Sequence, residues 1–261
     1  MPLPTPEQQI RRKIERRFKK ALTDYRMLDD GDRILVALSG GKDSLTLLCA
    51  LAALKRFYPK KFELCAITVD MGFEGADFSS IRKLCEELDV PYHVVPTEIQ
   101  KIIFEVRKEK NPCSLCAKMR RGALHTAAKE LGCNTVALGH HFDDVVETFM
   151  LNLFFEGRLG CFQPVTYLSR MDIRLIRPMI YMPEKDVRYF ANGANLPVIK
   201  SPCPADGNTQ REEMKQLLAK LDRENKGLRY RIFGAIQRGQ IDGFKPIPNM
   251  QGIKSYDNDE E

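Results

Sequence analysis

The segment LSGGKDS, from Leu38 to Ser44, restricts the fold of this chain more than any other feature. It follows the apolar, β-rich run 33–37 and precedes the helical sequence LTLLCALAAL. A glycine turn between a strand and a helix presents backbone N–H groups and a helix N-terminus, which together bind anions. The segment therefore predicts a phosphate site at the carboxyl end of a buried strand.

The remaining sequence alternates strand-like and helix-like patterns. Strands are predicted at 33–38, 63–69, 91–95, 134–138 and 172–177, and helices at 43–56, 78–89, 114–131, 143–155, 183–193 and from 211 onward. This alternation is typical of an α/β fold in which a parallel, twisted sheet is covered by helices on both faces. With 261 residues and 43% hydrophobic content, the chain is long and apolar enough to fill such a core.

Four segments are expected along the chain: a basic helical segment (1–28), an α/β domain (29–205), a helical segment (206–244) and a disordered tail (245–261). The longest apolar stretch, Leu45 to Leu54, is too short to cross a bilayer. We therefore expect a cytoplasmic protein with no membrane partner. The formal charge of +6 is concentrated near the start of the chain, which favours a polyanionic partner.

Two well-known phosphate motifs do not fit the glycine turn. The P-loop NTPase pattern requires glycine where the chain has Val36. The dinucleotide fingerprint fails because Gly40 and Gly41 are adjacent. The six residues of the turn itself still suit a phosphate. Ser39 and Ser44 supply hydroxyls, Gly40 and Gly41 let the backbone approach a ligand closely, Lys42 supplies a cation and Asp43 a carboxylate. An ordinary strand-to-helix turn is the alternative, but the flanking elements favour phosphate binding.

Polar residues also follow the second and fourth predicted strands. Asp70 comes after the second strand, and Gly139 and Asp144 come after the fourth. In an open α/β sheet, ligands bind at these carboxyl ends, so all three residues are expected at the nucleotide site. Asp143 and Asp144 open a helix, where carboxylates are favourable against the helix dipole alone. We nevertheless expect Asp144 to hold Mg²⁺, which takes few carboxylates and completes its shell with water and phosphate oxygens.

Three of the eight cysteines do not look structural. Cys113 and Cys116 form a C-x-x-C pair at a predicted helix start, where nearby cations favour the thiolate, and Cys203 lies in a polar loop flanked by prolines. A C-x-x-C pair alone fits a redox dithiol, half a zinc site, a cluster site or two packed thiols. Structural zinc normally takes four ligands. Three thiolates suit a [4Fe-4S] cluster that leaves one iron open for a sulfide ion.

The glycine turn resembles the pyrophosphate loop (PP-loop) of the ATP pyrophosphatase superfamily, which has a Rossmann-like fold. Together with NPCSLCAKMRRGAL, LGHHFDDVVETFMLNLFFEGRL and CPADGNTQREEMKQLL, it makes the chain from about Ile10 to Phe244 resemble the tRNA 2-thiocytidine synthetase family. Members are ATP-dependent tRNA sulfurtransferases that thiolate an anticodon-loop cytidine. The resemblance implies that 39–44 binds ATP and that Cys113, Cys116 and Cys203 ligate a [4Fe-4S] cluster. It also implies catalytic roles for these three cysteines and, by similarity to related cluster-dependent thiolases, for Lys42 and Asp144.

A tRNA substrate gives the basic residues a function. We expect two sets of basic residues to contact RNA phosphates. The first lies on the helix 9–22 and consists of Arg12, Arg16, Arg17 and Lys20. The second lies beside the cysteines and consists of Lys118, Arg120 and Arg121. A solvated helix face is the alternative for each. A sulfur donor, such as a cysteine desulfurase or free sulfide, is a further expected partner, and the sequence leaves a homodimer open.

Three other functions remain open at this point. The 2-thiouridine-forming relatives share the core but carry several extra C-x-x-C zinc pairs, which this sequence lacks. Another PP-loop adenylating enzyme, such as a lysidine-forming ligase, would need no three-cysteine set. A nucleotide-binding or iron-sulfur sensing protein would bind ATP or a cluster without turnover.

Overall fold

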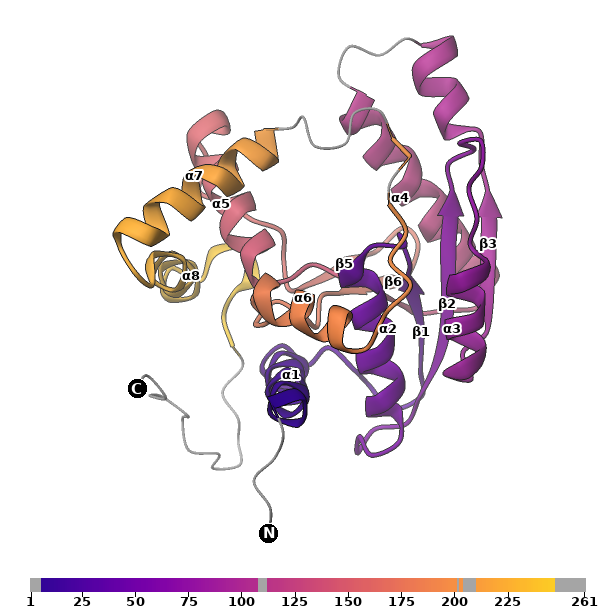
Figure 1. Ribbon diagram of the computed structural model, residues 1–261, viewed down its shortest axis with the longest axis horizontal. Coiled ribbons are helices and arrows are strands. Elements are labelled where there is room, and N and C mark those ends of the chain that lie inside the picture. Colours follow the sequence, from indigo (N-terminus) through magenta and orange to yellow (C-terminus); the bar gives the residue numbers. More distant parts are fainter. Residues whose placement is uncertain (1–5, 108–111, 201, 204–209, 247–261) are drawn as a thin grey trace.

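The computed structural model describes residues 6–107, 112–200, 202–203 and 210–246 (Figure 1). Its helices are α1 (Pro6–Asp24), α2 (Lys42–Lys55), α3 (Ser79–Glu87), the π-helix η1 (Lys101–Val106), α4 (Pro112–Glu130), α5 (Phe142–Glu156), α6 (Glu184–Gly193), α7 (Gln210–Glu224), α8 (Leu228–Arg238) and the 3-10 helix η2 (Ile241–Gly243). Its strands are β1 (Asp32–Ala37), β2 (Phe62–Asp70), β3 (Tyr92–Pro96), β4 (Thr135–Ala137), β5 (Val165–Leu168) and β6 (Ile173–Ile176).

The described strands form one six-stranded sheet in the order β3-β2-β1-β4-β6-β5. All neighbouring pairs are parallel except β5 and β6, which are antiparallel. The predicted α/β fold is confirmed, and the sheet is mostly rather than wholly parallel. The order of the strands reverses between β1 and β4, and ligands bind at such a switch point, outside the carboxyl ends of the strands. The glycine turn after β1 lies at this place.

The sheet is buried on both faces, because successive side chains of its strands enter two separate apolar clusters. In β1, Ile34 and Val36 belong to the larger cluster, whereas Leu35 belongs to the smaller one. The larger cluster contains residues of α1, α2, α5 and α6, and α4 covers the smaller cluster with Ala127 and Ala128. This alternation follows from the period of two along a strand.

The predicted N-terminal and C-terminal helical segments are both helical in the structure, but each differs in detail from the prediction. Helix α1 packs into the larger cluster through Phe18 and Leu22, so the N-terminal segment shares the core of the sheet. The helical region predicted from 211 is divided into α7 and α8 at Gly227, whose φ of +78° favours glycine. Of the predicted disordered tail, 247–261 lies outside the described residues, and the predicted segment boundaries remain predictions. None of the described helices is long and apolar enough to span a membrane.

Candidate active site

The glycine turn between β1 and α2 is held together by hydrogen bonds of its own serine hydroxyls. Ser44 Oγ donates to Gly41 O (3.0 Å) and accepts from the Ser39 amide (3.2 Å). Gly40 has a φ of +82°, and a Cβ there would lie 3.2 Å from Ile199 Cβ. Both the backbone conformation and the close contact therefore favour glycine at this position. The turn therefore holds its shape through its own side chains and leaves the start of α2 open to an anion.

Lys42 lies at the first position of α2 between two carboxylates. Its Nζ is 3.1 Å from Asp43 Oδ2 and 3.1 Å from Glu184 Oε1. Burial alone would lower the pKa of Lys42, but the charges of Asp43 and Glu184 outweigh it and raise the pKa. Lys42 is thus a fixed cation at the mouth of the turn.

Glu184, at the start of α6, was not predicted as a site residue. Its carboxylate contacts three cations: Lys42, Lys215 Nζ at 2.9 Å and Arg188 Nη2 at 3.0 Å. Burial would raise the pKa of Glu184, but the ion pairs with Lys215 and Lys42 lower it to about 2. In the sequence, a glutamate directly after Pro183 looks like ordinary helix-dipole compensation, so no local pattern distinguishes it.

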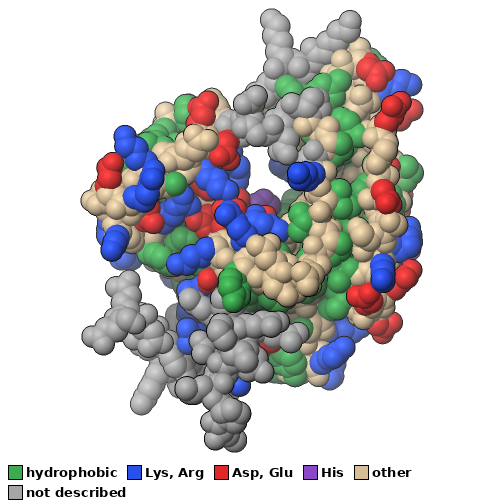
Figure 2. All heavy atoms as spheres, in the orientation of Figure 1, with side chains coloured by type: hydrophobic (Ala, Val, Ile, Leu, Met, Phe, Trp, Pro, Cys, Tyr) green, Lys and Arg blue, Asp and Glu red, His purple; other side chains and the backbone are tan. Residues whose placement is uncertain are grey.

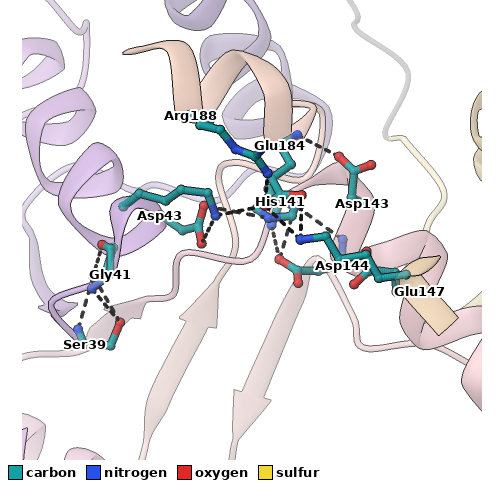
Figure 3. A network of polar contacts seen from close by, with 12 residues as sticks. Ser39, Gly41, Asp43, His141, Asp143, Asp144, Glu147, Glu184 and Arg188 are labelled. Carbon is teal, nitrogen blue, oxygen red and sulfur yellow. Dashed lines mark hydrogen bonds and ion pairs between the residues drawn. The ribbon is translucent and has the colours of Figure 1, made fainter. Parts of the chain in front are cut away.

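The start of α5 meets the start of α2 through His141 (Figure 3). His141 and Asp144 form a capping box, in which the His141 amide donates to Asp144 Oδ2 (2.8 Å) and the Asp144 amide donates to His141 Nδ1 (3.4 Å). His141 Nε2 lies 3.7 Å from Asp43 Oδ1. Arg211 of α7 donates to Asp144 Oδ1 (3.1 Å). Asp43 and Asp144 are therefore held on either side of one imidazole.

Mg²⁺ fits these two carboxylates. Asp43 Oδ1 is buried and has no hydrogen-bond partner among the described residues. A buried carboxylate oxygen without a donor is costly unless a ligand satisfies it. Asp144 offers a second carboxylate, and a cation with few protein ligands and several waters is typical of Mg²⁺ at phosphate sites.

Asp143, the neighbour of Asp144, has a structural role. It lies buried, accepts from the Glu184 amide (2.7 Å) and forms an ion pair with Arg229 of α8. It thereby ties α5 to α6 and α8. The two adjacent aspartates thus have different surroundings, because neighbouring residues on a helix point in different directions.

Two further predicted residues line the carboxyl edge of the sheet. A Cβ on Gly139 would lie 3.1 Å from the Ser44 amide nitrogen, so glycine lets the turn after β4 approach the start of α2. Asp70 Oδ1 accepts from the Gly72 amide (2.9 Å) and shapes the turn after β2, the strand next to β1. Gly139 thus lies beside the start of α2, and Asp70 ends the strand that pairs with β1; a role for either residue in nucleotide binding stays a prediction.

The three predicted cluster ligands come from two distant segments and meet at α4. Cys113 is exposed and Cys116 half-buried in the first turns of α4, and Cys116 Sγ lies 3.6 Å from Met71 Sδ. Burial raises the pKa of Cys116, Arg120 opposes this, and the nearby thiols of Cys203 and Cys113 raise it further. The effect of Cys203 on the pKa of Cys116 places these two thiols near each other.

The donor types at this place, three thiols, fit an iron-sulfur cluster. In the part of the chain that the structure describes, no three His, Cys, Asp or Glu residues are close enough together to hold a single metal ion. Thiolates are the usual ligands of a four-iron cluster. Burial raises the pKa of Cys116 and so opposes the expected stabilisation of its thiolate by the helix start and the nearby cations.

The basic residues fall into two separate groups. On α1, Arg12 and Arg16 are exposed, whereas Arg17 forms an ion pair with Asp186 of α6 and Lys20 lies 3.1 Å from Asp24. On α4, Lys118, Arg120 and Arg121 are exposed beside the cysteines. Figure 1 places α1 beyond α6, away from the first turns of α4. Figure 2 shows a hollow in the centre of this face, with Lys and Arg side chains around it.

Comparisons with known proteins agree with this arrangement. Residues 8–222 match the family model described as a PP-loop domain. The chain is 40% identical over 228 residues to the tRNA-cytidine(32) 2-sulfurtransferase of Geobacter sulfurreducens, covering 86% of this chain and 89% of that protein. A similar match, 40% over 237 residues, covers 90% of this chain and 92% of the tRNA-cytidine(32) 2-sulfurtransferase of Syntrophotalea carbinolica.

The chain belongs to the PP-loop family. Within that family it groups with the tRNA-cytidine(32) 2-sulfurtransferases, so the resemblance read from the motifs is confirmed. Among solved structures, it is similar to the U34-tRNA thiolase NcsA from Methanococcus maripaludis with its [4Fe-4S] cluster. The TM-score is 0.76 at 28% identity, over 89% of this chain and 79% of that chain.

One buried carboxyl group of this PP-loop site has an unusual pKa. Glu147 is one turn beyond Asp144 on α5, and its side chain is 4% exposed. Burial, with the charge of Asp144, raises the pKa of Glu147 to about 7, although Arg211 and Lys215 oppose the shift. Its Oε1 has no hydrogen bond to another described residue, and Arg229 Nη1 is 3.9 Å away. The sequence showed only a carboxylate in the second turn of a helix.

Proposed function

We propose that this enzyme adenylates the C2 oxygen of an anticodon-loop cytidine with ATP and replaces that oxygen by sulfur, which forms 2-thiocytidine. The observation that carries the proposal is the convergence of Cys113, Cys116 and Cys203 in a chain that also has a PP-loop nucleotide site. The named activity of the relatives that are 40% identical supports it. The thiolase with a [4Fe-4S] cluster supports the assignment of the three thiols.

The first step is adenylation. The amides of the glycine turn and Lys42 bind the triphosphate, since a helix N-terminus and a fixed cation both stabilise its negative charge. Asp43 and Asp144 are assigned to Mg²⁺, whose role is to neutralise phosphate oxygens. The cytidine O2 attacks the α-phosphorus, the bond from this phosphorus to the bridging oxygen breaks, and pyrophosphate leaves. The poor leaving oxygen at C2 thereby becomes part of AMP.

The second step is sulfur transfer. Sulfide attacks C2, the C2–O bond breaks, and AMP leaves with that oxygen. A cluster held by Cys113, Cys116 and Cys203 supplies, when bound, an open iron site that carries and orients the sulfide. No electron is transferred in this exchange. A cysteine desulfurase or free sulfide is proposed as the sulfur source, in the cytoplasm, and a homodimer remains part of the proposal.

A 2-thiouridine product is the second candidate, and one observation favours it. The structural relative with the [4Fe-4S] cluster is named a U34-tRNA thiolase. Its identity to this chain is 28%, below the 40% shared with the cytidine enzymes. Incubation with unmodified tRNA, ATP and sulfide, followed by nucleoside analysis, separates the two products.

The decisive experiment is anaerobic purification with iron, labile-sulfide and product analysis of wild type and Cys203→Ala. We expect wild type to hold iron and sulfide and to form 2-thiocytidine with AMP release. Cys203→Ala should lose the iron and the product while it still binds ATP. The matched control is Cys49→Ala, which removes a thiol from the apolar side of α2 and should change neither. Equal product from Cys203→Ala would refute the role of the thiols.

A further inference from the structure

Arg177 lies at the carboxyl end of β6, just past the strand, on the far side of β4 from the glycine turn. Its Nη1 is anchored by two acceptors from the neighbouring edge, Gln163 O at 2.5 Å and Thr166 Oγ1 at 3.2 Å. The guanidinium also stacks 5.1 Å from the ring centroid of Phe162. These contacts fix the position of the group, yet none of them carries a negative charge.

The charge of Arg177 is not neutralised by the described part of the protein. The residue is 8% exposed, forms no ion pair with any described residue, and its buried Nε has no hydrogen-bond partner among them. Burial is the main cause that lowers its pKa to about 10; the positive charge of Arg121 contributes to the decrease, and Cys161 opposes it. A buried cation without a counter-charge is costly, and an orphaned buried donor calls for a ligand.

The imidazole that packs beside Arg177 supplies no counter-charge to it. His140 packs on Phe162 with ring centroids 4.8 Å apart, and its buried Nδ1 has no hydrogen bond to a described residue. Burial lowers the pKa of His140 to about 4, so the imidazole is neutral at physiological pH. The carboxylate that affects His140, Asp144, is already paired with Arg211. Arg177, which is buried, and Arg121, which is exposed and close enough to lower the pKa of Arg177, are thus two cations without an ion pair to any described residue.

We propose that Arg177, together with Arg121 of α4, binds a backbone phosphate of the RNA strand next to the target nucleotide. The inference rests on the proposed function. The phosphates of ATP already have the glycine turn and Lys42, whereas Arg177 lies beyond β4, on the side left for the acceptor. A guanidinium binds phosphate oxygens through two parallel N–H donors, which fixes orientation as well as position. The contact would hold the nucleotide while its C2 oxygen reaches ATP.

The test is a double-mutant cycle between protein and RNA. The RNA is an anticodon stem-loop with the target cytidine, and single methylphosphonates remove the charge of the phosphate 5′ or 3′ to it. We expect Arg177→Gln to weaken binding of the natural RNA about 10- to 100-fold. One methylphosphonate should weaken wild-type binding by a similar factor, yet cause little further loss in Arg177→Gln. The slope of log binding constant against log salt concentration should also decrease in magnitude by about one, as expected for the loss of one phosphate contact.

Arg170→Gln is the matched control, because Arg170 is exposed in the turn at the opposite end of β6. It should leave the cycle unchanged. If Arg177→Gln does not fold, Arg121→Gln, at an exposed position, carries the same cycle. Additive losses at both phosphates, or weakened binding of an ATP analogue by Arg177→Gln, would overturn the inference. Failure of the proposed function is distinct, because wild type would then not thiolate the unmodified RNA.

Discussion

The nucleotide side and the thiol side of the site are stabilised in different ways. On the nucleotide side, the chain satisfies its own charges: Lys42 lies 3.1 Å from two carboxylates, and Asp144 lies 3.1 Å from Arg211. On the thiol side, Cys113 is exposed and Cys116 contacts Met71. Cys113 and Cys116 start α4, and Cys203 comes from a segment almost ninety residues later.

This difference indicates which half depends on a group from outside the chain. Opposite charges in contact hold the nucleotide side in place before ATP arrives, a form of preorganisation. Three thiols gain little from one another, and at Cys116 the thiols of Cys203 and Cys113 add to the burial that raises its pKa. ATP binding should therefore persist when the thiols are removed, and iron binding by the thiols should persist when Lys42 is replaced.

Lys42→Met gives the largest expected effect and tests this independence. The variant removes the fixed cation at the glycine turn, so tRNA-dependent AMP release should fall about 100- to 1000-fold. Its iron and labile-sulfide content should equal that of wild type, because Lys42 contacts carboxylates and no thiol. Elemental analysis and an AMP assay measure both quantities on one preparation. Loss of iron along with activity would show that the two halves are coupled.

Glu184→Gln should produce the next largest effect, on stability. Glu184 joins three cations, so its neutralisation should lower the free energy of unfolding at pH 7 by about 2–3 kcal/mol. Because the folded pKa of about 2 lies below the reference value of 4.5, this stabilisation is present above pH 4.5 and is lost as the pH falls toward 2.

Urea unfolding of wild type and Glu184→Gln between pH 7 and pH 3 measures that loss. The difference between the two proteins should shrink as the pH falls. Lys185→Gln, which changes the charge of the next residue on α6, is the control and should show no such trend. A difference that stays constant with pH would mean that Glu184 acts through packing and not through its charge.

Most of the fold could be predicted from the sequence because its elements have strong local patterns. The glycine turn, the apolar strands and the helices between them were placed within a few residues of α2, β2 and α5. Strand β5 was missed, since VTYL is short and lies at the edge of the sheet, where its burial pattern is weak. The antiparallel pairing of β5 with β6 is a tertiary preference that no single segment encodes.

The site was predictable where motif and position coincide. Lys42, Asp144 and the three cysteines stand in short strings with unusual chemistry, so their types alone suggested roles. Arg177 and Arg211 each look like one more surface cation in a sequence with 41 Lys and Arg residues. Arg177 stands out because it is buried, and Arg211 because it pairs with Asp144, far from it along the chain; periodicity reveals neither.

Glu147 is the exception on the nucleotide side and provides the smallest effect. Its folded pKa of about 7 lies above the reference value of 4.5, so the folded protein binds a proton that the unfolded chain releases. Stability from this group is therefore present below pH 4.5 and is lost as the pH rises through 7. Glu147→Gln should remove that loss and stabilise the enzyme at pH 8 by about 1–2 kcal/mol.

Thermal unfolding of wild type and Glu147→Gln at pH 5 and pH 8 tests this expectation. The variant should unfold at a higher temperature at pH 8, and its advantage should shrink at pH 5, where the wild-type carboxyl is protonated. Glu156→Gln, at the exposed end of the same helix, is the control for a change of charge alone. If Glu147→Gln were instead less stable at pH 8, the Glu147 carboxylate would be ionised and paired with Arg229. Every buried charge on the nucleotide side would then have its partner, and the contrast with the thiol side would be complete.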